Sequence, residues 1–219
     1  MTSNPNILDI IRQHSSQQFL PAHTFLFHQG DPIRDVYLLE KGLVKMMRGE
    51  RNGQEVTLEL RSAINILGAA SALANEPAPM TAITITSSKV HLLSVTEFLH
   101  LAKSDEVFLH NLIESVSRQR NEQFNLRSQQ SLLDARPRLA MLLLQFAQES
   151  GVERKGKLSL ALPIAKQEIA AMLSITPQRL SNILKEMKLA GVIAEEKGWI
   201  IFSDMQALTS EAETGKKSR

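Results

Sequence analysis

The stretch IAKQEIAAMLSITPQRLSNILKEMKLA, residues 164–190, has the pattern of two short helices joined by a tight turn. The first segment, Lys166–Leu173, places its apolar residues at i, i+3 and i+4, which makes one apolar face. The pattern then breaks for two residues. It restarts at Thr176, an N-cap hydroxyl, and Pro177 follows at the first helical position, where the absent N–H costs nothing.

The second helix predicted in this stretch has an apolar side and a polar side. The apolar side, which can pack on the first helix, consists of Leu180, Ile183, Leu184 and Met187. The polar side consists of Gln178, Arg179, Ser181, Asn182 and Lys185. Side chains of these types read base edges and hold phosphates when a helix enters the DNA major groove. The stretch therefore predicts a DNA-binding helix-turn-helix.

The segment after it, VIAEEKGWIIF (Val192–Phe202), strengthens this interpretation. It reads as a short apolar strand, a charged turn at Lys197 and Gly198, and a second strand that begins at Trp199. A helix-turn-helix followed by a two-stranded hairpin is the winged form of the motif. Two amphipathic helices of an ordinary globular domain would not require this hairpin.

Composition narrows the class of protein. The chain has 219 residues, 43% hydrophobic and 22% charged, which is ordinary for a soluble protein of one or two domains. No apolar run approaches the roughly 20 residues that span a bilayer, and the N-terminus shows no secretory signal. There are no cysteines, which excludes disulfides and cysteine-ligated zinc or iron–sulfur clusters. We expect a cytoplasmic protein without membrane contact.

Residues 19–100 contain short β-branched and apolar runs separated by turn signals. The hairpin signal Arg51-Asn52-Gly53 is the strongest of these turns. The strand candidates are Thr24–His28, Val36–Leu39, Leu43–Met47, Glu55–Leu60, Thr81–Thr86 and Lys89–Ser94. Regular spacing of this kind predicts an antiparallel barrel, sandwich or roll.

One long helix is predicted from Asp105 to about Leu133, because this stretch has no proline or glycine. Its thin apolar seam consists of Leu109, Leu112, Ile113, Val116 and Phe124. A long helix with a thin seam favours dimerisation. Packing of the same seam on the chain's own strands is the alternative, and both can hold on different faces.

A break near Asp134 is the predicted domain boundary and hinge. Asp134 can cap a new helix that tolerates Pro137 in its first turn. Beyond that helix, Gly151–Lys157 is predicted as a loop and Leu158–Leu162 as a strand.

The order of roll, long helix, hinge and winged helix resembles the cyclic-AMP receptor protein/FNR family of transcription regulators. The resemblance rests on FHQGD (Phe27–Asp31), LLEKGLVKM (Leu38–Met46), LLDARPRLAMLL from Leu132, and above all KQEIAAMLSITPQRLSNILKEM (Lys166–Met187). It implies an α+β fold with an N-terminal antiparallel β-roll, a jelly roll like that of cyclic-nucleotide-binding domains. The expected domains are the sensor roll at 1–103, the long dimerisation helix at 104–133 and the winged helix-turn-helix at 134–219.

The resemblance also assigns roles within the DNA-binding domain. It implies that Gln178, Ser181 and Asn182 read bases. Positions that resemble phosphate contacts are Lys166, Gln167, Thr176 and Arg179, and we add the outward-facing Lys185 and the wing residue Lys197. Many family members have glutamate and arginine where this chain has Gln178 and Asn182. Because glutamine and asparagine suit bidentate contact with adenine, we expect the half-site to shift towards A·T pairs.

The family's cyclic-nucleotide cassette corresponds here to Ile66–Thr84. Gly68 is retained, but Ala69 stands at the ribose glutamate and Met80 or Pro79 at the phosphate arginine. Without that arginine a buried phosphate lacks its charge-assisted partner, so we do not expect cyclic AMP bound in the usual way.

The effector, if one exists, is left open by the sequence. Haem remains an alternative, because histidine and methionine can ligate it, although the six histidines form no metal-spaced cluster. An anionic effector near Arg118, Arg120 and Arg127 is another, and a solvated basic helix face is the simpler interpretation.

These observations together predict a homodimeric, sequence-specific transcription regulator that binds double-stranded DNA at a near-palindromic operator. If it activates transcription, RNA polymerase is a further partner. The alternative is an effector-binding signalling or adaptor protein whose winged helix contacts protein. No catalytic residues are predicted, since the chain has no paired carboxylates, nucleophile elbow, metal cluster or phosphate-cradling glycine loop.

Overall fold

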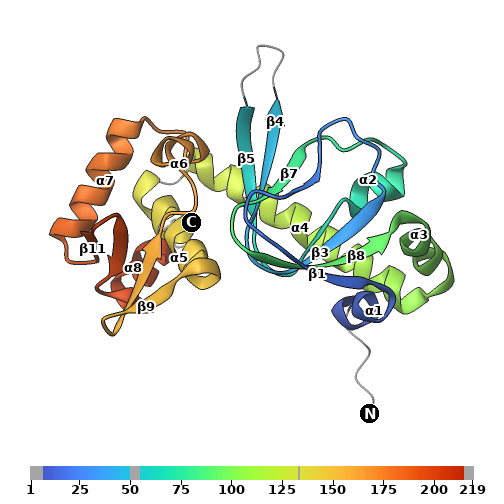
Figure 1. The fold of residues 1–219 in the computed structure, drawn as a ribbon. Coiled ribbons are helices and arrows are strands. Elements are labelled where there is room, and N and C mark those ends of the chain that lie inside the picture. The colour runs from blue at the N-terminus through green and yellow to red at the C-terminus, as the bar shows by residue number, and fades with distance from the viewer. Residues whose placement is uncertain (1–6, 50–54, 133, 215–219) are drawn as a thin grey trace. The chain divides into compact units, whose positions relative to one another are not determined.

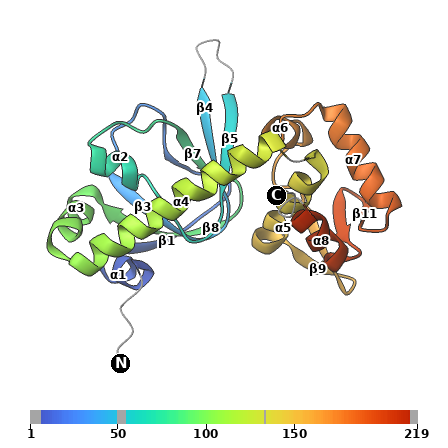
Figure 2. The same ribbon diagram turned by 180° about the vertical axis from the view of Figure 1, so that it is seen from behind.

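The computed structural model describes residues 7–49, 55–132 and 134–214, without the side chains of 122–132 and 214. The chain forms two compact units, Met1–Gln123 and Phe124–Arg219. Figures 1 and 2 show the strands of the first unit and the helices of the second from opposite sides. The division falls inside the long helix α4 (Glu106–Leu132) and not at the predicted boundary near residue 134.

The first unit is a roll of two four-stranded antiparallel sheets with strand orders β1-β8-β3-β6 and β2-β7-β4-β5. Their strands are β1 (Ser16–Leu20), β2 (Phe25–Phe27), β3 (Asp35–Lys41), β4 (Val44–Gly49), β5 (Glu55–Arg61), β6 (Asn65–Leu67), β7 (Thr81–Thr84) and β8 (Ser88–Ser94). The helices of this unit, besides the start of α4, are α1 (Ile7–His14), α2 (Ala69–Ala74) and α3 (Val95–Ser104). The predicted antiparallel roll is confirmed.

Six strands lie where the sequence predicts them, and β1 and β6 were not predicted. β1 is almost wholly exposed and shows no apolar alternation, so only its pairing with β8 reveals it as a strand. The predicted turn Arg51-Asn52-Gly53 lies outside the described residues, although β4 and β5 on either side of it do pair antiparallel.

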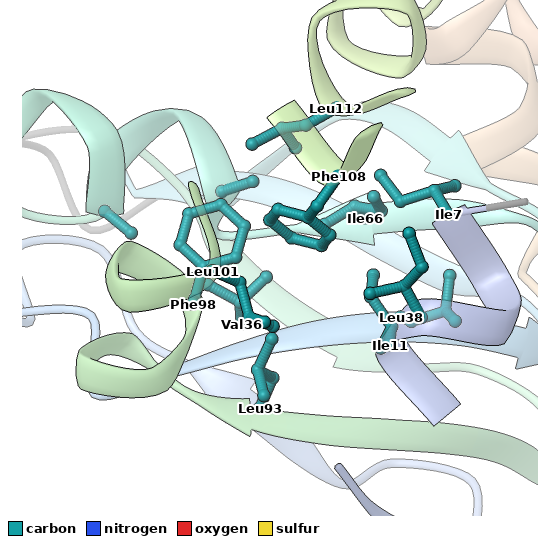
Figure 3. Close-up of a cluster of buried hydrophobic side chains, with 13 residues drawn as sticks. Ile7, Ile11, Val36, Leu38, Ile66, Leu93, Phe98, Leu101, Phe108 and Leu112 are labelled. Carbon is teal, nitrogen blue, oxygen red and sulfur yellow. The ribbon is translucent and has the colours of Figure 1, made fainter. Parts of the chain in front are cut away.

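Two apolar clusters stabilise the roll. One lies between the sheets and consists of Leu26, Leu39, Val44, Met46, Leu67, Ala82 and Val90. The other lies on the outer face of the β1-β8-β3-β6 sheet, where α1, α3 and the start of α4 cover it (Figure 3). There the Phe98 and Phe108 rings meet edge to face at 5.9 Å between centroids. The start of α4 is therefore part of the core of the first unit.

Helix α4 begins after Asp105, whose carboxylate accepts a hydrogen bond from the Phe108 backbone N–H at 3.0 Å. Figure 2 shows the helix crossing the face of β3 and β8. Its predicted apolar seam divides into two sides. Leu112 is 1% exposed within the outer cluster and Val116 packs against it, whereas Leu109 and Ile113 are 38% and 58% exposed.

The prediction that Leu112 belongs to a dimer seam is therefore wrong, because its own chain already buries it. Val116 lies on the same packed side. Leu109 and Ile113 remain available to a partner. The side chain of Phe124 lies outside the described residues.

The second unit contains a four-stranded antiparallel sheet with strand order β11-β12-β10-β9 and four helices that follow α4. Its elements are α5 (Ala135–Ser150), β9 (Val152–Arg154), β10 (Lys157–Ala161), α6 (Lys166–Met172), α7 (Pro177–Leu189), β11 (Ile193–Glu196), β12 (Trp199–Phe202) and α8 (Met205–Thr214). The loop predicted at Gly151–Lys157 contains strand β9. That strand is wholly exposed and has no apolar pattern to reveal it.

Asp134 lies between α4 and α5 at the N-cap position of α5, as predicted, but its carboxylate makes no capping hydrogen bond. Its negative charge instead interacts electrostatically with the Arg138 guanidinium, one turn further along α5. Burial lowers the pKa of the Arg138 guanidinium, and the carboxylate of Asp134 opposes that shift.

Candidate nucleic-acid interface

The helix-turn-helix forms from α6 and α7, as the sequence predicts. Ile169 is buried on α6, and Leu173 is buried at its C-cap position. The turn passes through Ser174 in the left-handed conformation, with φ 53°. The Thr176 hydroxyl then accepts a hydrogen bond from the Arg179 backbone N–H at 3.1 Å, and Pro177 opens α7. The predicted cap therefore starts the second helix.

Helix α7 has the two sides that its periodicity predicts. Its buried residues are Leu180, Ile183, Leu184 and Met187. Its exposed residues include all five predicted contacts, Gln178, Arg179, Ser181, Asn182 and Lys185. The outer face of α7 therefore exposes two amides, a hydroxyl and two cations that a ligand can contact directly.

Each of the three predicted base readers makes a hydrogen bond within α7. The Gln178 amide donates to the Asn182 side-chain oxygen at 3.3 Å, one turn away. The Ser181 hydroxyl donates to the Pro177 carbonyl at 2.9 Å, which leaves its lone pairs free to accept. The mutual bond uses one donor of Gln178 and one acceptor site of Asn182, so each amide keeps both kinds of group. Bidentate contact with adenine needs one donor and one acceptor.

The residues predicted to contact phosphate differ in whether they already form an ion pair within the protein. Arg179 forms an ion pair with Glu186 at 3.5 Å, and Lys166 forms one with Glu195 at 3.2 Å. Within the part of the chain that the structure describes, Lys185 and Lys197 have no ion-pair partner. Gln167 is exposed beside Lys166 at the start of α6, and Thr176 is exposed at the start of α7.

The wing is a hairpin of β11 and β12, as predicted. Lys197 and Gly198 at its turn have φ values of 50° and 82°. Positive φ at both central residues defines the type I′ turn, whose twist matches that of the strands. The exposed Lys197 therefore projects from the tip of a regular hairpin. At the neighbouring strands, the Arg154 guanidinium lies 4.1 Å from the centroid of the Trp199 ring.

Two carboxylates at this surface were not predicted. Glu195 on β11 pairs with both Lys166 and Lys188, and Glu186 on α7 pairs with Arg179 and, at 3.8 Å, with Arg136 of α5. Arg136 also forms two hydrogen bonds to Glu211 of α8. The spacing of Arg179 and Glu186 on one helix is a weak sequence signal. Nothing in the sequence places Glu195 beside the two lysines, because they meet only in the folded domain.

The segment that corresponds to the family's cyclic-nucleotide cassette is partly buried in the roll. Gly68 keeps a left-handed φ of 85°, and the neighbouring Ala69 is 2% exposed. Met80 packs against the cluster between the sheets. The hydroxyl of Thr81, the next residue, accepts a hydrogen bond from the Gln29 backbone N–H at 2.9 Å.

The histidine closest to the core is engaged by its own chain. His91 is 4% exposed, and its two ring nitrogens lie 2.6 Å from a Glu40 oxygen and 3.3 Å from the Ser15 hydroxyl. Across residues 7–49, 55–132 and 134–214, the histidines and carboxylates form no cluster of three with metal-binding geometry. Of the arginines considered for an anion, Arg118 pairs with Glu114 on the same helix, and the side chain of Arg127 lies outside the described residues.

Comparison with known proteins agrees with this architecture. Residues 17–105 match the cyclic nucleotide-binding domain model, and residues 137–211 match the Crp-like helix-turn-helix domain model. The global nitrogen regulator of Synechococcus elongatus is 26% identical over 197 residues, covering 89% of this chain and 88% of the relative. The cyclic AMP receptor protein of Thermus thermophilus is 24% identical over 189 residues, covering 86% of this chain and 84% of the relative.

A solved structure shows the same fold. A CRP-family transcriptional regulator from Thermus thermophilus superposes with a TM-score of 0.73 at 22% identity, covering 89% of this chain and 96% of that chain. None of the described helices is both long and apolar enough to cross a membrane.

A β-roll joined through a long helix to a winged helix-turn-helix with an exposed polar face defines a DNA-binding regulator. The chain belongs to the CRP/FNR family of transcription regulators, and like its relatives it is a regulator and not an enzyme.

Proposed function

We propose that the protein acts as a homodimer that binds a near-palindromic DNA operator in the cytoplasm and regulates transcription. The observation that carries this proposal is the outer face of α7, where Gln178, Ser181 and Asn182 are exposed together above a fully packed inner face. Two such helices in a symmetric dimer would enter successive major grooves about 34 Å apart. Among the side chains of α4 that the structure describes, Leu109 and Ile113 are the exposed large apolar ones and are available for the dimer contact.

The amides of Gln178 and Asn182 support a half-site richer in A·T pairs than that of family members with glutamate and arginine there. Selection of bound sequences from a random duplex pool by the purified protein tests this. The selected motif should be a near-palindrome, and Gln178→Ala should lose the preference at one position of each half-site. Gln206→Ala is a matched control, because Gln206 is an exposed glutamine on α8. An unchanged motif for Gln178→Ala would refute the base-reading role.

We also propose that any effector is not cyclic AMP held in the usual way. Support comes from Met80, which with Pro79 is a candidate for the position of the family's phosphate arginine and which packs against the apolar cluster between the sheets. Cyclic AMP at millimolar concentration should therefore leave the thermal midpoint unchanged, whereas a ligand at about 100 times its Kd would stabilise the protein by about 2.7 kcal/mol. The absorption spectrum of the freshly purified protein tests haem.

We place the hinge at Asp134, the exposed residue between α4 and α5. Pro137 follows in the first turn of α5, and Asp134 is not held by a capping bond. Replacing Asp134 by proline should restrict this link and change DNA affinity, and Asp134→Ala, which also removes the charge that faces Arg138, serves as the control for stability. Equal DNA affinity of the variant and the wild type would contradict the hinge.

A further inference from the structure

Glu195 joins three elements of the winged helix through one carboxylate. One oxygen lies 3.2 Å from the Lys166 ammonium at the start of α6. The other lies 2.8 Å from the Lys188 ammonium in the last turn of α7. Each oxygen therefore holds a different lysine, and β11 brings the charge between the two helices of the motif.

The three side chains lie at the surface, with relative exposures of 49% for Lys166, 38% for Lys188 and 34% for Glu195. Ion pairs this exposed are weak and are screened by salt, so another anion can replace the carboxylate. The hydrogen bonds from Lys188 and then Lys166 lower the pKa of the Glu195 carboxyl below its ordinary value, so it is ionised at neutral pH.

We propose that Glu195 is an internal competitor for DNA phosphate, which occupies Lys166 and Lys188 in the free protein and sets the strength and salt dependence of DNA binding. The inference rests on the proposed DNA binding and adds to it a residue that contacts no base. Each ammonium has three N–H donors, so a phosphate that binds either lysine either displaces one carboxylate oxygen or lies beside it and is repelled by its negative charge. Lys185 and Lys197 need no such exchange, because among the described residues they have no ion-pair partner.

A structural role for Glu195 predicts the opposite change in DNA affinity when its carboxylate is removed. If the carboxylate served mainly to hold α6, α7 and β11 together, its removal would lower stability and weaken DNA binding. If it competes with phosphate, its removal strengthens binding, and the loss of two exposed ion pairs changes stability little. DNA affinity and thermal stability together therefore separate the two roles.

The experiment compares Glu195→Gln with the wild type for a random-sequence duplex, with fluorescence anisotropy at several salt concentrations. Glu213→Gln is the matched control, because it removes the same charge from an exposed position on α8. We expect Glu195→Gln to bind about 3- to 10-fold more tightly at low salt and to steepen the plot of log K against log salt by about 1 to 2. Glu213→Gln should change affinity less than about 2-fold.

A double-mutant cycle assigns the gain to the lysines. In a Lys166→Gln background, Glu195→Gln should give a smaller gain, because only Lys188 remains to be released. Weaker binding by Glu195→Gln, or a gain that Glu213→Gln matches, overturns the competitor role. Absence of salt-dependent binding by the wild type overturns DNA binding itself, and the two failures are therefore distinguishable.

Discussion

Replacing Ile113 by glutamate should dissociate the proposed dimer while the first unit stays folded. Ile113 is 58% exposed on α4, whereas Leu112 beside it is 1% exposed in the core of its own unit. In a symmetric dimer each apolar contact occurs twice. Burying an isoleucine fully contributes about 1.5–3 kcal/mol, so the exposed 58% of two copies contributes roughly 2–3.5 kcal/mol to association.

That loss corresponds to a dimer Kd about 30- to 300-fold weaker, since each 1.4 kcal/mol is about tenfold. Two glutamates facing each other in the same contact would weaken it further. Sedimentation equilibrium measures the association, and circular dichroism measures unfolding. Gln206→Glu on α8 controls for the added charge.

Leu112→Ala is the contrasting variant. It should lower the free energy of unfolding by about 2–5 kcal/mol, because it leaves a cavity in the cluster around Phe108. It should leave the association constant of the folded protein near the wild-type value. If Ile113→Glu dimerises as the wild type does, the exposed side of α4 is not the dimer contact and the reasoning fails.

Three further predictions concern stability. The hydrogen bond from His91, and after it the hydrogen bond and charges of neighbouring cations, lower the pKa of the Glu40 carboxyl from 4.5 to about 2. The ionised Glu40 therefore stabilises the fold by up to about 3 kcal/mol above pH 4.5, and this stabilisation is lost as the pH falls towards 2. Urea unfolding of Glu40→Gln at neutral and acidic pH should show this loss at neutral pH only. Thr176→Ala removes the cap on the Arg179 N–H and should cost about 1 kcal/mol, which Thr176→Ser should restore; equal unfolding midpoints would contradict the cap. Ile64→Gly should be more stable than Ile64→Ala by up to about 1 kcal/mol, because both lose the same side-chain contacts and only alanine keeps the left-handed strain at φ 61°. A lower midpoint for Ile64→Gly than for Ile64→Ala would show that the strain is absent.

The features predicted correctly from sequence are those that depend on neighbours a few residues away. The cap at Thr176 and the turn at Lys197 and Gly198 involve contacts within one turn or one hairpin. The outer face of α7 follows from the helical period alone. The edge strands β1 and β9 are not predicted, because both segments are exposed and have no apolar pattern. Only their hydrogen bonds to β8 and β10 make them strands.

In the candidate site too, contacts between residues far apart in the sequence could not be predicted. Periodicity identified which side chains of α7 face outward, but it did not show that Glu195, 29 positions after Lys166, neutralises that lysine. The pairing depends on where β11 lies against α6 and α7. Exposure of a cation could be predicted from sequence, and its partner could not.

The sequence by itself determined the class of fold and the DNA-binding motif, because periodicity, caps and turn residues act locally and agree with one another. Only the tertiary structure decided which side of α4 is available to a partner. Leu109, Leu112, Ile113 and Val116 follow one another around the helix as a single apolar seam. Packing on β3, β6 and β8 buries Leu112 and leaves Ile113 exposed, and the long-range contacts responsible leave no mark in the spacing of these residues.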